Sequence, residues 1–170
     1  MLHMNSKTKK IVIAALMAAL TCVATLVIKI PSPLKGYINL GDCFVLVAGW
    51  MLSPAWGFLA AGLGSALADI LSGYMIYGPA TFLIKGLMSL VAFYGFKLLH
   101  NKFNNLFSKI ISGIAAETVM IVGYFIFAGI LYGFGPAVVN IPANVVQGIA
   151  GILIGIILMK IFEKSKMILK

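Results

Sequence analysis

Four ionisable side chains lie within or at the edge of long apolar runs: Asp42, Asp69, Lys85 and Glu117. An ionisable group inside a bilayer costs at least a few kcal/mol, so each is a candidate functional residue. Lys85 has three possible roles: pairing with an aspartate, hydrogen bonding to a polar ligand, or snorkelling to the membrane surface. Asp42 begins an apolar run, where a helix N-cap or an exposed interfacial position is an equal alternative. The sequence names no partner for Glu117.

A second polar group stands at the start of the last apolar run. Asn140, Asn144 and Gln147 are spaced i, i+4 and i+7, so a helix places them on one face. Carboxamides offer hydrogen-bond donors and acceptors without the cost of burying charge. The face predicts ligand contacts, although hydrogen bonding between helices is the alternative.

Two polar segments between apolar runs carry further candidates: Tyr37 and Asn39 in the first, Tyr74 and Tyr77 in the second. Tyrosines are common at the membrane surface in any case. Together with Lys85, however, they predict the mouth of a small-molecule site.

Several kinds of chemistry have no sequence signal. The chain has no Walker motif, and both histidines lie outside the apolar runs. Its acidic residues do not cluster as metal-dependent catalysis requires. The sequence therefore predicts a binding component that is not an enzyme and needs no cofactor or metal.

Composition defines the solvent that these residues face. The chain is 62% hydrophobic and 10% charged, with a mean hydropathy of +1.08, whereas soluble domains are roughly half apolar and a quarter charged. The formal charge of +9 comes from lysine alone. Because bidentate recognition of phosphates and bases favours arginine, the charge does not indicate nucleic-acid binding. The lipid bilayer is the expected environment.

The apolar pattern predicts an all-α integral membrane protein, a single domain with six transmembrane helices. A helix needs about 20 residues to cross a hydrocarbon core of about 30 Å. The expected spans are about 11–30, 39–52, 55–71, 80–99, 110–131 and 141–161.

Six spans put both termini on one side of the membrane. Ten of the thirteen lysines fall on that side: Lys7, Lys9, Lys10, Lys97, Lys102, Lys109, Lys160, Lys164, Lys166 and Lys170. The positive-inside rule therefore predicts cytoplasmic N and C termini. Lys35, Tyr37 and Tyr77 then lie on the outer side.

The first span carries two pairs of alanines on helical faces. Ala14 and Ala18 form one pair, and Ala15 and Ala19 the other. Small residues let membrane helices approach closely. The faces therefore serve either packing within the chain or contact with a partner protein.

These features resemble the substrate-binding (S) components of energy-coupling factor (ECF) vitamin transporters. The resemblance rests on AALMAAL in the first span, YINLGD before the second, and GSALADILSGYMIYGPATFLIKG across the third and fourth. It covers essentially the whole chain, and the last two motifs are its more specific part.

The resemblance implies a multi-pass subunit of an ABC-type importer in the cell membrane of a bacterium. Such a subunit binds a vitamin on the outer side and delivers it inward with a transmembrane coupling protein and two cytoplasmic ATPases. It implies contact with the coupling protein through the alanine face, with Ala14 and Ala18 foremost. Residues 37–42 and 73–79 would form the gates, and Lys85, Asn144 and Gln147 would contact the ligand.

The motif style is closest to members associated with hydroxymethylpyrimidine or pyridoxine, with riboflavin as the alternative. A small planar nitrogen heterocycle suits carboxamides, a lysine and tyrosines. A stand-alone secondary transporter or channel is the alternative of another class. It is disfavoured because the charges gather on the outer side and leave the midplane without an ion path.

Overall fold

The computed structural model describes residues 6–32 and 36–164, and these residues form an all-helical bundle. The main helices are α1 (Ser6–Val27), α2 (Gly41–Met51), α3 (Pro54–Leu71), α4 (Gly78–His100), α5 (Asn105–Tyr132) and α7 (Ile141–Lys164). The six-helix fold class is thereby confirmed. Lys35, Lys166 and Lys170, which contributed to the predicted orientation, lie outside the described residues.

Within the described part of the chain, five helices are long and apolar enough to cross a membrane: α1, α3, α4, α5 and the α6–α7 segment. The expected second span differs, because α2 has only 11 residues. At 1.5 Å per residue it is roughly 16 Å long, about half of a hydrocarbon core.

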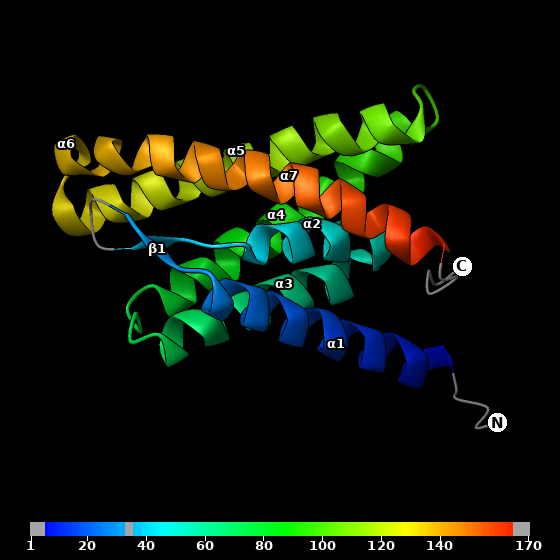
Figure 1. The fold of residues 1–170 in the computed structure, drawn as a ribbon, viewed down its shortest axis with the longest axis horizontal. Coiled ribbons are helices and arrows are strands. Elements are labelled where there is room, and N and C mark those ends of the chain that lie inside the picture. Colours follow the sequence, from blue (N-terminus) through cyan, green and yellow to red (C-terminus); the bar gives the residue numbers. More distant parts are fainter. Residues whose placement is uncertain (1–5, 33–35, 165–170) are drawn as a thin grey trace.

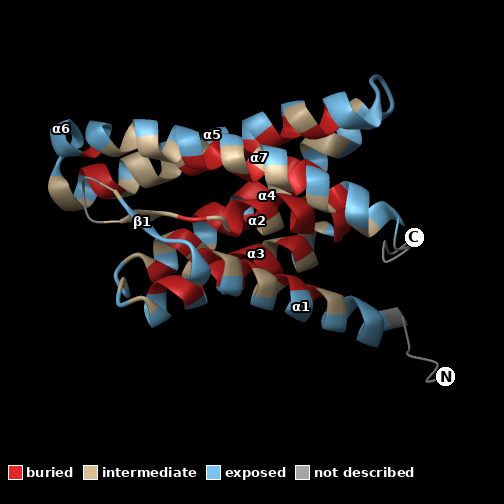
Figure 2. Ribbon diagram, viewed as in Figure 1, coloured by how far each residue is buried: buried red, intermediate tan, exposed pale blue. Residues whose placement is uncertain are grey.

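The short helix lies in the middle of the bundle (Figure 1). It packs against α1, α3, α4 and α7, and all of its residues except Phe44 are buried (Figure 2). A helix that is apolar all round is stable when it is enclosed on all sides. Its length is therefore set by the interior of the protein, while the helices around it face the lipid.

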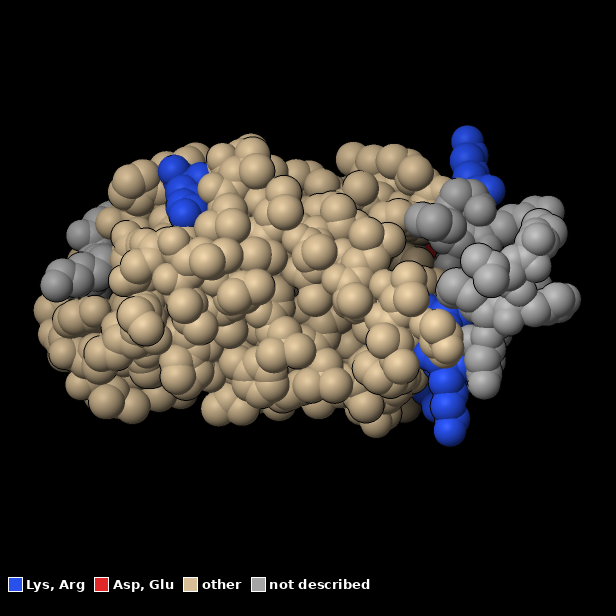
Figure 3. Space-filling view, turned by 90° about the horizontal axis from the view of Figure 1, so that it is seen from below, with Lys and Arg blue, Asp and Glu red and all other residues tan. Residues whose placement is uncertain are grey.

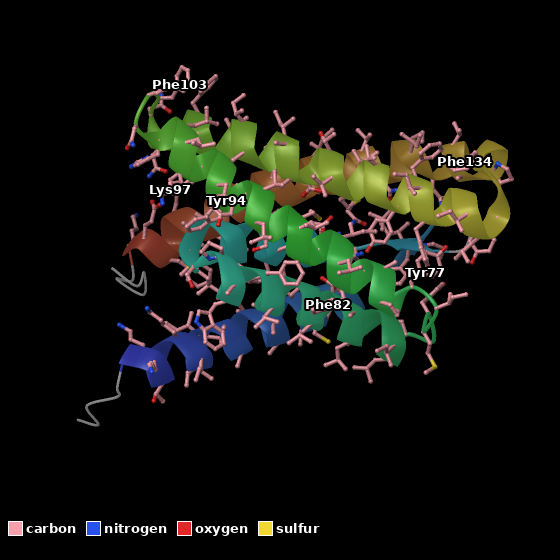
Figure 4. The ribbon with its side chains drawn as sticks, turned by 180° about the vertical axis from the view of Figure 1, so that it is seen from behind. Tyr77, Phe82, Tyr94, Lys97, Phe103 and Phe134 are labelled. Atoms are coloured by element: carbon pink, nitrogen blue, oxygen red, sulfur yellow. The ribbon has the colours of Figure 1, made fainter. Side chains whose placement is uncertain are left out.

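The two described ends of the chain lie at the same end of the bundle (Figure 1). Lysine side chains gather at this end on the face shown in Figure 3. Lys97 and Phe103 also lie here, whereas Tyr77 and Phe134 lie at the opposite end (Figure 4). By the positive-inside rule the lysine-rich end is cytoplasmic. We call it the inner end, and the opposite end the outer end.

The outer end has structure that the sequence did not predict. Two short antiparallel strands, β1 (Ile30–Pro31) and β2 (Tyr37–Ile38), form a hairpin between α1 and α2. A short helix α6 (Phe134–Ala137) and a 3-10 turn η1 (Val138–Asn140) lead into α7. Gly133 interrupts the helix between α5 and α6 with a φ of 91°, a conformation that glycine adopts without a Cβ penalty. These elements form part of the wall of a cavity at the outer end.

Candidate functional site at the outer end

A cavity of about 60 Å³ lies at the outer end, between the β1–β2 hairpin and helices α3, α5 and α7. Its polar lining residues are Ser32, Tyr37, Asn39, Asp69, Tyr74, Tyr77, Tyr124, Asn140, Asn144 and Gln147. The hairpin, the turn after α3 and the start of α7, which are far apart in the sequence, thus meet in one place. All but two of the expected substrate-contacting residues line this cavity; the exceptions are Lys85 and Asp42.

Aromatic rings cover one side of the cavity. Tyr37 of the hairpin lies 5.2 Å from Tyr74, between ring centroids, and Tyr74 lies 6.2 Å from Tyr77. Tyr77 in turn meets Phe127 of α5 at 5.2 Å. Tilted and edge-on contacts of this kind stabilise aromatic pairs beyond their buried area. They hold the hairpin and the turn after α3 against α5.

Lys29 ties the hairpin to the end of α3. Its Nζ lies 5.4 Å from the centroid of the Tyr37 ring and donates a hydrogen bond to Ser72 Oγ at 2.5 Å. A cation above an aromatic face is attracted by the ring quadrupole. Together the two contacts hold Tyr37 of the hairpin against the end of α3.

Asp69 accepts a hydrogen bond from a hydroxyl group on each of its two carboxylate oxygens. Its Oδ1 accepts from the Tyr37 hydroxyl at 2.6 Å, and its Oδ2 accepts from the Thr81 hydroxyl at 2.5 Å. Burial, followed by the nearby Asp69 charge, raises the pKa of Tyr37, which keeps its proton and donates it. The sequence marked Asp69 as a charge at the end of a span but did not place it in the binding site. Asp69 lies four residues after Ser65 and close to the loop that follows the span. This position was the sequence signal that could have placed Asp69 in the binding site.

Gln147 of α7 forms the floor of the cavity. Its Nε2 donates to Asp42 Oδ2 at 2.6 Å, and its Oε1 accepts from the Asn39 backbone N–H at 2.9 Å. Asn39 then caps the next turn, because its Oδ1 accepts from the Gly41 N–H at 2.8 Å. The first turn of α2 is therefore fixed to α7 by side-chain amides. Asn140 and Asn144, which share the face of Gln147, also reach the cavity wall.

Lys85 lies behind this floor and not in the cavity lining. It forms an ion pair with Asp42, and the two side chains are 3% and 0% exposed. Its Nζ is 5.4 Å from the centroid of the Tyr124 ring. Such burial excludes snorkelling to the membrane surface. Of the roles that the sequence left open, the structure shows pairing with Asp42, so Lys85 influences the cavity through Asp42 and Gln147.

Glu117 of α5 is buried close to the Lys85–Asp42 pair. It is 3% exposed, and neither carboxyl oxygen has a hydrogen-bond partner among the residues that the structure describes. Gly148 and Gly151 of α7 make room for it: a Cβ at either position would come within about 3 Å of its side chain. Buried polar groups without a partner are rare in folded proteins. Glu117 therefore places a buried polar group in the contact between α5 and α7.

The structure separates the two alanine pairs of α1. Ala14 is buried in the core, and the Ala18 carbonyl lies against Gly64 of α3. Ala15 and Ala19 are exposed. The Ala14–Ala18 face therefore packs within the chain, and the Ala15–Ala19 face is the one open to a partner.

The fold and the site together define a membrane-embedded binding subunit with a small polar cavity at its outer end. Among residues 6–32 and 36–164, no group of three or more histidine, cysteine, aspartate or glutamate side chains is arranged to hold a metal. The family model for the S component of ECF-type riboflavin transporters matches residues 5–164. The chain belongs to this family of ECF transporter S components. It is a multi-pass membrane protein and not an enzyme, and membership sets aside the stand-alone transporter or channel.

Two relatives also match this chain over most of its length. A protein of Pyrococcus woesei described only as uncharacterised is 36% identical over 134 residues, which is 78% of this chain and 87% of that protein. The thiamine precursor transporter HmpT of Lactococcus lactis is 26% identical over 163 residues, 95% of this chain and 92% of that protein. A bacterium and an archaeon are both represented, so the cell membrane of either is a consistent setting.

Two solved structures share the fold. The S component of a bacterial ECF transporter superposes with a TM-score of 0.72 at 23% identity, covering 94% of this chain and 98% of the other. The biotin S component of an ECF-type ABC transporter superposes with a TM-score of 0.67 at 22% identity, covering 96% and 95%. At these identities the two structures support the fold alone.

Proposed function

We propose that this S component captures a vitamin precursor of the hydroxymethylpyrimidine or pyridoxine type from outside the cell. The observation that carries the proposal is the outer cavity, which combines tyrosine rings, four carboxamides and one carboxylate. Planar rings stack on aromatic side chains, while amides and hydroxyls orient the heteroatoms of a ligand. The relative named as a thiamine precursor transporter supports the same ligand class.

The size of the cavity also favours a compact ligand. Typical ligand pockets have volumes of about 300–1,000 Å³, and this one has about 60 Å³. To fit a cavity of this size, a single-ring heterocycle would displace the tyrosines outward less than a larger ligand would. Riboflavin, with three fused rings and a ribityl chain, is the second candidate because the matching family model is described as the S component of an ECF-type riboflavin transporter. It would require the larger opening of the cavity.

We further propose that the exposed face of α1, with Ala15 and Ala19, contacts the transmembrane coupling protein, which acts with two cytoplasmic ATPases. Leu16 and Val23 are also exposed on this helix. Small residues on a lipid-facing surface allow a second membrane helix to approach closely. Ala14 and Ala18 contribute indirectly, by seating α1 on α3.

Binding by the purified chain tests the proposed ligand class. Isothermal titration calorimetry in detergent should detect hydroxymethylpyrimidine or pyridoxine at low ligand concentration, and riboflavin and thiamine serve as comparison ligands. If riboflavin binds and the single-ring compounds do not, the second candidate replaces the first. If none of the four binds, the proposed capture of vitamin precursors is wrong.

The α1 face has its own test. Ala15→Trp together with Ala19→Trp should abolish uptake in cells that express the coupling protein and ATPases, while the purified variant still binds ligand. Leu59→Trp, at an exposed position of α3, is the matched control for adding a bulky side chain to a lipid-facing surface. Unchanged uptake by the double variant would exclude this face from the interface.

A further inference from the structure

We propose that Asp69 makes this cavity selective for nitrogen heterocycles that carry an amino group beside a ring nitrogen. Such a ligand presents an amino N–H donor beside the ring nitrogen, and two neighbouring N–H donors with a positive charge when that ring nitrogen is protonated. This inference rests on the proposed function and narrows its ligand class. It adds a specificity-determining residue that the sequence did not assign.

The charge balance of the described residues sets Asp69 apart. Asp42 pairs with Lys85, and Glu163 pairs with Lys109. Glu117 is buried between α5 and α7, away from the cavity lining. Asp69 lines the cavity, is 8% exposed, and has no lysine within the 4.0 Å of an ion pair among the residues that the structure describes. The charges of Lys85 and Lys29 act on Asp69 only from a longer range. A buried carboxylate with no cation in direct contact attracts a cationic or N–H-rich ligand.

The hydroxyl protons around Asp69 point toward it. Tyr37 donates to Oδ1 and Thr81 donates to Oδ2. Thr81 has only one hydroxyl proton, so Tyr124, whose oxygen lies 3.0 Å from Thr81 Oγ1, must be the donor in that contact. The hydroxyl protons of Tyr37 and Thr81 are therefore donated to Asp69, and that of Tyr124 is donated to Thr81.

This arrangement leaves acceptors for the ligand. Each oxygen of an ionised carboxylate accepts about two hydrogen bonds, and the protein supplies one to each oxygen. One further position on each oxygen can accept the paired N–H groups of a protonated aminopyrimidine edge, and one of them is enough for the amino N–H of the neutral ring. Tyr37, Tyr74 and Tyr124 also line the cavity, and aromatic rings attract charged or planar ligands.

Asp69 also has a structural role that must be separated from selectivity. Through Tyr37 and Thr81 it joins the hairpin to α4, and its backbone carbonyl accepts from the Tyr74 N–H at 2.9 Å. If this were its whole role, replacing Asp69 would weaken the binding of every ligand by the same factor. Selectivity predicts a loss that depends on the ligand.

Two pyrimidines that differ at one position make the test. The probes are 4-amino-5-hydroxymethyl-2-methylpyrimidine and its 4-oxo counterpart, in which the amino group is replaced by oxygen. Titrated into the full-length protein, the amino compound should bind at least about tenfold more tightly, the factor expected from one charge-assisted hydrogen bond. Asp69→Asn should reduce this preference to less than about threefold.

Tyr37→Phe is the matched control, because it removes one hydroxyl from Asp69 and keeps the carboxylate. It should retain the preference for the amino compound, whatever its overall affinity. Equal binding of the two pyrimidines by the wild-type protein would overturn the role of Asp69, even if Asp69→Asn does not fold. An equal loss of both in Asp69→Asn would overturn it as well. Both results leave the proposed function standing, whereas failure to bind any vitamin-like compound counts against that function.

Discussion

Lys85 and Lys109 each pair with a carboxylate on another helix, but their surroundings differ. Lys85 of α4 meets Asp42 of α2 behind the cavity, where both side chains are almost fully buried. Lys109 of α5 meets Glu163 of α7 at the inner end, where the Glu163 side chain is 35% exposed. The first pair is enclosed by protein on both sides, whereas in the second Lys109 is buried and only Glu163 is partly open to water.

The connections of the two pairs differ as well. Asp42 also accepts from Gln147, which lines the cavity, so the enclosed pair is joined to the binding site. The Lys109 Nζ lies 5.9 Å from the centroid of the Phe96 ring, a contact between neighbouring helices. Enclosed ion pairs add little net stability compared with apolar packing, but removing one partner is costly. The comparison therefore predicts that the outer pair constrains the site and that the inner pair only fastens helix ends.

Asp42→Asn should have the largest effect on stability. It leaves the Lys85 charge buried without a counter-ion, and breaking a buried pair in this way costs roughly 3–5 kcal/mol. Thermal unfolding in detergent, followed by circular dichroism, measures the loss. Lys85→Met added to Asp42→Asn should recover much of it, because the uncompensated charge is then gone. A double variant as unstable as the single one would show that the charge is not the cause.

Glu117→Met should act in the opposite direction. Within residues 6–32 and 36–164 the Glu117 oxygens have no hydrogen-bond partner, and a buried polar group in this state costs about 1–3 kcal/mol. Methionine has a similar length and no such cost, so the variant should unfold at a higher temperature. Glu117→Gln, which keeps a polar end, is the control and should show no gain. Destabilisation by Glu117→Met would mean that the carboxyl group does have a partner.

Gln147→Ala tests the link between the enclosed pair and the cavity. It removes a lining residue and leaves Asp42 Oδ2 and the Asn39 N–H without their partner. Ligand affinity should fall about tenfold, which corresponds to about 1.4 kcal/mol, and the unfolding temperature should fall too. Asn144→Ala removes a lining carboxamide outside this chain of hydrogen bonds and should lower affinity alone. Equal stability of the two variants would show that Gln147 does not connect the enclosed ion pair to the cavity.

The sequence predicted the helices well because their signal is local. Runs of apolar residues and the lysines beside them determine the spans and their orientation without reference to other parts of the chain. The shared face of Asn140, Asn144 and Gln147 follows from helical periodicity alone. For the same reason their meeting in one wall could be expected before any tertiary contact was known.

Contacts between distant segments were beyond such reasoning. Gln147 and Asp42 are 105 residues apart, and Lys85 and Asp42 are 43 apart. Periodicity gives the face of a helix but not the neighbour that covers it. It could not show that Ala14 packs inward while Ala15 faces outward, or that Asp69 belongs to the cavity and Lys85 lies behind it. The short α2 was misjudged in length because an enclosed helix need not match the bilayer.

Glu163→Gln should have the smallest effect and completes the comparison. It makes the same change at the inner pair that Asp42→Asn makes at the outer one, and the new amide oxygen can still accept from Lys109. Because the Glu163 side chain is partly exposed, water and salt screen the pair, and the loss should not exceed about 1 kcal/mol. Raising the salt concentration should shrink the difference from wild type further, whereas the defect of Asp42→Asn should persist because its site is enclosed. Equal salt dependence of the two variants would show that the two ion pairs share one environment, and the distinction between a site-constraining pair and a helix-end pair would then fail.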